Sequence, residues 1–356
     1  MFKKQSLVLL AALASFICAS VCINAQDQQE EIVRVKTRVV FVDTLVTDNA
    51  GMPIADLKRE NFEVRADGRR RELSYFSRAA EGRRRPLAIL LVVDLVSHDS
   101  EEYRRRPEVL QSLTTAVQKL STADEVAVIA NLGGPDAQLK TLADFTRDRA
   151  KIAEALAAVQ SLPAPHSSLY RSEIDNVLKL AEEAAAKRRD SQIIIVTLSN
   201  PYGPMRFSER DKIVGRLIRI NTTFSPLIRE VGAGSIKMHN VPGKFPTPPR
   251  SVFATVGRLT GNDMYAPEHI AEQTGGDATV VRQPEDYSAA FERFFASLAA
   301  RYNLGFTLKE SEQDDGKMHK LEVRVKARDS KGKDRKLVAR ARRGYYLHMS
   351  EQPVEK

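Results

Sequence analysis

Cysteine and tryptophan are almost missing from this sequence of 356 residues, which has two cysteines and no tryptophan. Both cysteines, Cys18 and Cys22, lie in an apolar N-terminal stretch. Because the rest of the chain has none, we expect no disulfide framework, no thiolate nucleophile and no cysteine-based metal site there. The fold must therefore be stabilised by packed hydrophobic cores.

The N-terminal stretch itself has the pattern of an export signal. Lys3 and Lys4 precede an apolar segment over residues 6–23, and Ala25 precedes a polar spacer over residues 26–32. This pattern predicts a signal peptide cleaved near Ala25 and a protein exported to the periplasm, the cell envelope or the medium. Two alternatives stay open, namely a retained membrane anchor and lipidation of one of the cysteines. No later segment approaches the length of a membrane span.

Acidic residues do not balance the basic ones, and the formal net charge is +9. The excess gathers in four arginine-rich clusters, which we expect to be solvated on turns and strand ends. An anionic envelope surface is the alternative partner. Nucleic acid is not expected, because the protein is exported and the clusters lack the interleaved aromatic residues of a base-stacking surface. The clusters are residues 69–71, 83–85, 104–106 and 340–343.

Motifs of the common enzyme classes are also missing. The sequence has no G-x-S-x-G elbow, no H-E-x-x-H helix and no Walker loop. Gly232-Ala233-Gly234 lacks the third glycine of a dinucleotide-binding loop. We therefore expect a protein that is not an enzyme.

Both ends of the remaining chain read as β-strands. Residues 33–80 contain the alternating stretch VRVKTRVVFVDTLVTD, typical of a half-buried strand, and a hairpin, NFEVRADGRRRELSYF, around Asp67-Gly68. Residues 303–347 contain three further strands, NLGFTLK, KLEVRVKA and KLVARARRGYY. Neither end supplies enough strands for a closed core. We therefore predict one Ig-like β-sandwich built from both ends, followed by a tail over residues 348–356.

The middle, residues 86–302, alternates strands and helices. PLAILLVVD and SQIIIVTLSN are continuous apolar runs, as expected for central parallel strands buried on both faces, and QLKTLADF is a probable edge strand. The alternation predicts a doubly wound, Rossmann-like α/β domain that binds ligands at the carboxyl ends of its strands. Residues 232–267 are rich in glycine and proline and break this rhythm, which indicates a lid, a partner-contact loop or a disordered insertion.

Three segments together resemble the VWFA-related domain family of exported bacterial proteins. They are FVDTLVTDNAGMPIADLKRENFEVRADGRRRELSYFSR, IAEQTGGDATVVRQPEDYSAAFERFFASLAARYNLGFTL and the closing ARRGYY. The resemblance implies a von Willebrand factor type A core, a fold that binds partners through a metal-ion-dependent adhesion site. In such a site, oxygen ligands from three loops hold Mg²⁺ or Ca²⁺ and leave one position for a carboxylate of the partner.

Mapped onto this sequence, the adhesion site is degenerate. Its first aspartate is Asp94, but the two hydroxyl positions after it hold Val96 and His98, with Ser97 between them. Too few anionic oxygens remain to offset the dehydration of a hard cation, so we expect no cofactor and no functional Mg²⁺ or Ca²⁺ site. The threonine position falls on Ser167, or on Ser168 one residue later, and the last aspartate position falls on Asn200.

The sequence thus predicts an exported interaction or adhesion module that binds an unknown protein or an anionic envelope partner. The predicted binding face comprises Asp94, Val96, Ser97, His98, Ser167, Asn200 and the loop 232–267. A first alternative is a Zn²⁺-binding or other metal-binding protein or hydrolase that uses Asp94, His98 and His166 on the same face. A second alternative makes the sandwich, with Arg69 to Arg71, the binding module.

Overall fold

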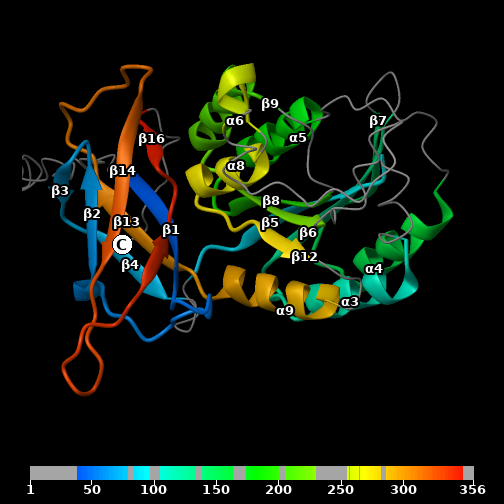
Figure 1. Ribbon diagram of the computed structural model, residues 1–356, viewed down its shortest axis with the longest axis horizontal. Coiled ribbons are helices and arrows are strands. Elements are labelled where there is room, and N and C mark those ends of the chain that lie inside the picture. Colours follow the sequence, from blue (N-terminus) through cyan, green and yellow to red (C-terminus); the bar gives the residue numbers. More distant parts are fainter. Residues whose placement is uncertain are drawn as a thin grey trace, which may run out of the picture. The chain divides into compact units, whose positions relative to one another are not determined.

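The computed structural model describes residues 38–78, 84–96, 105–133, 138–162, 174–199, 205–229, 255, 257–263, 265–281 and 286–347. Figure 1 shows two groups of strands, one flanked by helices and one formed by the ends of the described chain. Within these residues no helix is both long and apolar enough to cross a membrane.

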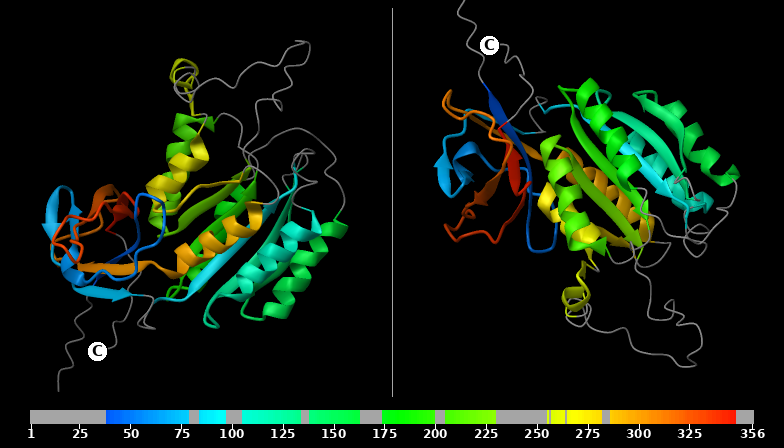
Figure 2. Two further views of the ribbon diagram at one scale, coloured as in Figure 1. Left: turned by 60° about the horizontal axis from the view of Figure 1, so that its bottom comes forward. Right: turned by 90° about the horizontal axis from the view of Figure 1, so that it is seen from above.

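Strands from the two ends of the described chain form two antiparallel sheets of four strands each. Their orders are β15-β1-β13-β4 and β16-β14-β2-β3, so each sheet combines early and late segments. Figure 2 shows this as blue strands beside orange and red ones. The predicted sandwich is therefore confirmed. Its strands are β1 (Val39–Thr47), β2 (Phe62–Ala66), β3 (Arg69–Arg71), β4 (Tyr75–Arg78), β13 (Tyr302–Thr307), β14 (Met318–Val325), β15 (Val338–Arg340) and β16 (Gly344–Tyr346), and a 3₁₀ helix, η1 (Arg59–Asn61), precedes β2.

The inner faces of the two sheets share one hydrophobic core. Val40 of β1 and Val64 of β2 are fully buried within it. Tyr302 lies at its centre, where its hydroxyl donates to the carbonyl of Ile54 at 2.8 Å and accepts the N–H of Leu57 at 3.0 Å. Because a buried hydroxyl is stable only when it is hydrogen-bonded, this pair of contacts fixes the β1–β2 connection onto the core.

Two predicted strand segments divide between the sheets. The segment 336–346, predicted as one strand, is β15 in one sheet and β16 in the other. The predicted hairpin forms between β2 and β3, with positive φ angles of 49° at Asp67 and 76° at Gly68, but the chain then crosses to the other sheet as β4. Short strands that change sheets close the edges of a sandwich, and local sequence pattern does not reveal the crossing.

The burial of β1 also differs from the prediction. Its alternating sequence predicts one exposed face, yet eight of its nine residues are buried. The outward face of β1 packs against the rest of the molecule, since the guanidinium of Arg85 lies 5.3 Å from the Phe41 ring and Arg342 Nη2 donates to the Phe41 carbonyl at 2.8 Å. A tertiary contact therefore covers a face that the sequence marks as half polar.

The core sheet has six strands in the order β12-β10-β8-β5-β6-β7. All neighbours are parallel except the edge strand β7, which pairs with β6 in antiparallel fashion through an irregular register. The predicted fold class, a doubly wound α/β domain within a β-sandwich, is confirmed. The strands are β5 (Leu87–Asp94), β6 (Glu125–Gly133), β7 (Gln138–Thr146), β8 (Gln192–Ser199), β10 (Thr223–Arg229) and β12 (Thr279–Val281).

Helices cover both faces of this sheet (Figure 1). Side chains of α3, α4 and α9 pack with one face of β5, and those of α5, α6 and α8 pack with the other. Each helix presents an apolar stripe to the sheet, which explains why β5 and β8 are apolar at successive positions. The helices are α3 (Pro107–Gln118), α4 (Arg149–Ala158) followed by η3 (Val159–Ser161), α5 (Ile174–Lys187), α6 (Phe207–Arg219), α8 (Ala266–Thr274) and α9 (Asp286–Ala299).

Two glycines end α8 as the sequence predicts. Gly275 adopts a left-handed φ of 79°, which favours glycine at a helix C-terminus. Gly276 lies against the backbone of β10, where a Cβ atom would collide with the carbonyl oxygen of Phe224. The Gly-Gly pair therefore both stops the helix and allows its close approach to the sheet.

The end of the predicted loop 232–267 is structured. Residues 257–260 are helical, β11 (Asn262–Asp263) pairs with β9 (Met205–Arg206), and α8 begins at Ala266. Asp263 accepts a hydrogen bond from Arg210 of α6 at 2.7 Å. Residues 232–254, 256 and 264 of that loop lie outside the described residues.

The prediction that the arginine clusters are solvated is wrong for several members. Arg84 forms a two-pronged ion pair with fully buried Asp124, at 2.9 and 2.5 Å. Arg85 donates to backbone carbonyls, Arg71 pairs with Glu312, and Arg342 is only 6% exposed. Arg84, Arg85 and Arg342 are bound because they lie near the junction of the sandwich and the core sheet, whereas Arg71 is bound within the sandwich. In contrast, Arg69 and Arg70 are exposed as predicted.

Candidate functional site

The carboxyl ends of β5, β6, β8 and β10 lie at one edge of the core sheet, because these strands are parallel. Asp94 is the last residue of β5 and is paired in register with Asn131 of β6. Ser199 is the last residue of β8 and follows Leu198, which is paired with Val93. This carboxyl edge is the place where the sequence predicts the binding face.

The Asp94 carboxylate is engaged by its own surroundings. Its Oδ1 atom accepts the N–H of Val96 at 3.1 Å and the side-chain amide of Asn131 at 3.3 Å. The Asn131 amide oxygen in turn accepts the N–H of Gly133 at 3.1 Å. This chain of hydrogen bonds links the residues just after β5 to the end of β6, so the carboxylate orders the edge of the sheet.

Val96 lies in the interior and offers little surface to a partner. Its side chain is 6% exposed and faces Gly133, where an added Cβ atom would lie 3.1 Å from Val96 Cγ2. Gly133 also has a positive φ of 65°. The residue that the resemblance aligns with a hydroxyl position thus packs against the end of β6.

Several predicted site residues cannot be placed. Ser97, His98, His166, Ser167, Ser168 and Asn200 lie outside the described residues, as does most of the loop 232–267. Within the part of the chain that the structure describes, no group of three histidine, cysteine, aspartate or glutamate residues is arranged to hold a metal ion.

Sequence reasoning missed polar residues at the same edge. Asn131 bonds to Asp94, and Ser199 is 3% exposed with its hydroxyl 3.4 Å from that of Thr197. Asn131 closes the apolar run EVAVIAN, and Ser199 closes QIIIVTLS. A polar residue at the end of a buried parallel strand is a signal that was present in both runs.

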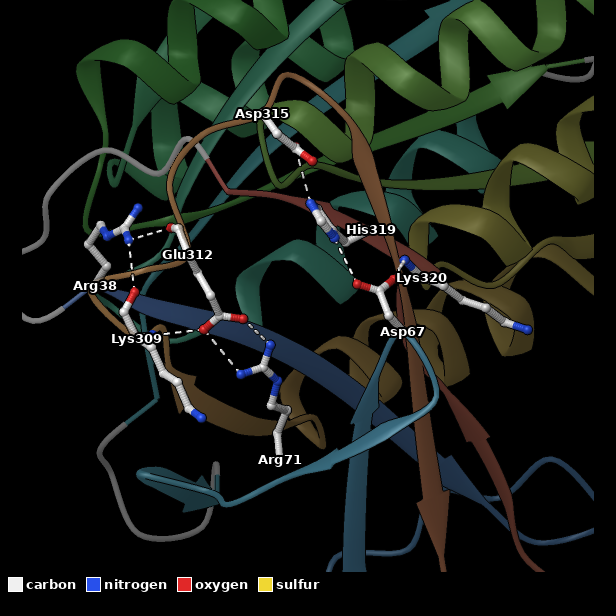
Figure 3. Close-up of polar contacts among 8 residues, drawn as sticks. All are labelled: Arg38, Asp67, Arg71, Lys309, Glu312, Asp315, His319 and Lys320. Carbon is white, nitrogen blue, oxygen red and sulfur yellow. Dashed lines mark hydrogen bonds and ion pairs between the residues drawn. The ribbon is translucent and has the colours of Figure 1, made fainter.

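A second polar cluster lies on the sandwich (Figure 3). His319 of β14 lies between Asp67 and Asp315, with Nδ1 2.8 Å from Asp67 and Nε2 3.2 Å from Asp315. Partial burial lowers the pKa of His319, but the hydrogen bonds to the two aspartates outweigh it and raise the pKa. This cluster ties the β2–β3 turn to the segment before β14.

The neighbouring ion pair between Arg71 and Glu312 is also visible in Figure 3. It borders a hollow of about 730 Å³ that is lined by further basic residues, including Arg69 and Arg70. The Glu312 carboxylate also accepts the backbone N–H of Lys309 at 2.8 Å, so the charge of Glu312 is neutralised within the sandwich. The contacts of Arg71 are thus those of a structural residue that holds the segment after β13.

Comparisons with known proteins extend only to solved structures. No protein-family model matches the chain, and no curated protein matches its sequence. The human COPII-coat protein Sec24c aligns over 75% of this chain and 44% of its own, with 10% identity and a TM-score of 0.38. This chain therefore spans less than half the length of Sec24c.

Two further structures are similar to parts of the chain. The SpRpn10 VWA domain aligns over 58% of this chain and 93% of its own, with 11% identity and a TM-score of 0.38. Proximal thread matrix protein 1 from the mussel byssus aligns over 60% of this chain and 48% of its own, with 14% identity and a TM-score of 0.37. At these identities and TM-scores the likenesses carry no conclusion about function. The strand order and the helices on both faces are those expected of the von Willebrand factor type A core that the sequence resemblance implies.

Proposed function

We propose that the protein is an exported, non-enzymatic interaction module that binds a protein partner at the carboxyl edge of its core sheet without a bridging metal ion. The observation that carries this proposal is the state of the Asp94 carboxylate. Its Oδ1 atom accepts two hydrogen bonds from the protein itself, from Val96 N–H and from Asn131 Nδ2. These two hydrogen bonds reduce the acceptor capacity that this carboxylate has for a hard cation, which needs several oxygen ligands.

The surrounding residues support the same conclusion. In the sequence, Val96 stands at a hydroxyl position of the adhesion site, and its side chain packs against Gly133 at the end of β6. In the sequence, His98 and Asn200 replace a second hydroxyl and a carboxylate of the adhesion site. The face retains half-buried Asp94 beside polar strand ends, which suits hydrogen bonding to a partner.

Thermal unfolding with added cations tests the absence of a functional metal site. We expect the same unfolding temperature in EDTA, Mg²⁺ and Ca²⁺. If a cation did bind, a concentration of about 100 times its Kd would stabilise the fold by about 2.7 kcal/mol, and the rise in unfolding temperature would be readily measured. The matched control is Asp94→Asn, which keeps an oxygen acceptor for Val96 and Asn131 but removes the charge. A Mg²⁺-dependent rise that Asp94→Asn abolishes would contradict the proposal. A rise with Zn²⁺ alone would favour the alternative use of Asp94 with His98 and His166.

Partner capture tests the face itself. The purified protein, immobilised and exposed to envelope extract, should retain the same partner in EDTA and in Mg²⁺. Asp94→Asn should weaken that retention, whereas Asp56→Asn on the sandwich, whose side chain is 68% exposed, should leave it unchanged. Equal retention by both variants would show that binding occurs elsewhere. Export through residues 1–25 is tested separately by fractionation of cells that carry the tagged protein.

A further inference from the structure

A cavity of about 240 Å³ lies at the opposite, amino-terminal edge of the core sheet, where the sandwich meets it. Arginines contribute to its wall from four separate segments. They are Arg85 just before β5, Arg188 and Arg189 after α5, Arg219 at the end of α6, and Arg342 between β15 and β16. Two aromatic residues of the sandwich, Phe41 and Tyr346, complete the wall. The cavity is thus formed by side chains that are distant in the sequence.

Two of these arginines are fixed in place by stacking. The guanidinium of Arg219 lies 4.1 Å from the centre of the Tyr346 ring, and that of Arg85 lies 5.3 Å from the Phe41 ring. Stacking on an aromatic ring orients a guanidinium but leaves its N–H donors available in the plane. Among the described residues, no carboxylate forms an ion pair with either arginine.

Arg85 and Arg342 are also held by backbone carbonyls. Arg85 Nη2 donates to the carbonyls of Arg189 and Ser191 at 2.9 and 3.0 Å, and Arg342 Nη2 donates to that of Phe41 at 2.8 Å. One nitrogen of each side chain, Arg85 Nη1 and Arg342 Nε, is buried without a hydrogen-bond partner. Buried donors of this kind are costly unless an acceptor satisfies them.

The buried charges around the cavity are not balanced. Asp43 of β1 is the acidic group near Arg85, Arg342 and Arg301, and it is 9% exposed. Burial raises the pKa of Asp43 although neighbouring arginines oppose this, and burial lowers the pKa of Arg342 to about 10, so the guanidinium stays protonated at neutral pH. Asp43 thus lies among more guanidinium groups than one carboxylate can neutralise, and uncompensated buried charge is unfavourable.

The acidic residue that lines the cavity does not balance its arginines. Glu182 of α5 lines the cavity, but both of its oxygens accept hydrogen bonds from Arg216, at 2.8 and 3.1 Å. Its charge is therefore neutralised by Arg216, which does not line the cavity. The cavity keeps a net positive character that arises from residues already held in position.

We propose that this cavity binds a phosphate-sized oxyanion, either inorganic phosphate or the head of a small phosphate ester. The planar donor forks of the arginines match tetrahedral oxyanions, and such charge-assisted hydrogen bonds are among the stronger ones in proteins. The volume argues for a small ligand, since cavities for larger organic ligands occupy about 300–1,000 Å³. A bound anion would join the sandwich to the core sheet through Arg342, Arg85 and Arg219.

Calorimetric titration of the purified protein with sodium phosphate tests the proposal, with sodium chloride at equal ionic strength as the blank. We expect saturable binding of phosphate and a Kd below about 10 mM. Arg219→Gln should weaken binding by about 10-fold or more, the loss expected for one charge-assisted hydrogen bond. Because Arg219 is exposed, this variant should fold. The matched control is Arg335→Gln on the sandwich, whose partner is Asp56, and it should bind phosphate as the unchanged protein does.

A parallel titration with glycerol phosphate distinguishes the two sources of the anion. Tighter binding than that of inorganic phosphate would assign the site to a phosphate ester, and weaker or no binding would assign it to the free ion. The proposal is wrong if phosphate produces no saturable heat, if chloride gives the same response, or if Arg219→Gln and Arg335→Gln bind equally. These outcomes do not depend on partner binding at the carboxyl edge, so this site and the proposed function are tested independently.

Discussion

The ion pair between Arg84 and Asp124 should contribute far more to stability than the many surface pairs of this protein. The Asp124 side chain is 0% exposed and that of Arg84 is 13% exposed. The carboxylate accepts two hydrogen bonds from Arg84 and one each from the N–H groups of Leu87 and Ser121, at 2.9 and 3.1 Å. It therefore anchors the segment that enters β5 to the turn that precedes β6.

Replacing Arg84 with methionine leaves this carboxylate buried with only backbone donors. Loss of one partner of a buried pair costs about 3–5 kcal/mol, and since two N–H donors remain to Asp124 we expect a cost near the lower end, about 3 kcal/mol. The matched control is Arg335→Met. Its pair with Asp56 is exposed at the carboxylate, and such surface pairs contribute about 0.2–1 kcal/mol.

Urea denaturation measures both changes, and a high-salt repeat separates the two kinds of pair. At about 1 M salt the Debye length is about 3 Å, so the small effect of Arg335→Met should shrink further, while that of Arg84→Met should persist. The double variant Arg84→Met with Asp124→Leu should lose less stability than the two single losses added together, because no unpaired charge stays buried. A loss of less than about 1 kcal/mol in the free energy of unfolding of Arg84→Met would refute this reasoning, because a loss of that size is typical of an exposed ion pair.

Three further changes test other parts of the fold. Gly276→Ala should prevent stable folding, because the new Cβ would collide with the backbone of Phe224. Soluble yield and circular dichroism measure this, and a variant with native-like values would contradict it. Tyr302→Phe should cost about 1–3 kcal/mol in urea denaturation by leaving the Leu57 N–H unpaired, and an unchanged midpoint would argue against it. His319→Asn should lower the free energy of unfolding more at about pH 5.5 than at about pH 8.5. A raised pKa in the folded state adds stability that is fully present below the unfolded-state pKa and is lost as the pH rises through the folded-state pKa. An equal loss at both pH values would contradict this.

The candidate site was predictable in part. Asp94 ends a continuous apolar run, so its position at the carboxyl edge of the sheet follows from the sequence alone. The hydrogen bond from Asn131 was not predictable, because it depends on the register between β5 and β6. Nor does spacing reveal that Val96 is turned inward against Gly133, since that contact joins the residues after β5 to the end of a different strand, β6.

The sequence by itself determined the two kinds of architecture. Alternation of apolar runs and helical stripes specified the α/β core, and the strand-rich segments at both ends specified one shared sandwich, because each pattern encodes which face of an element is buried. Only the tertiary structure decided that β1 is covered on both faces and that segment 336–346 divides between two sheets. It also decided that Arg342 is buried and that Arg84 and Arg85 are half-buried and hydrogen-bonded. Charge and hydropathy are properties of single residues, whereas burial depends on which distant segments meet, and at the junction of sandwich and core those segments gather arginines around Asp43 and a small cavity.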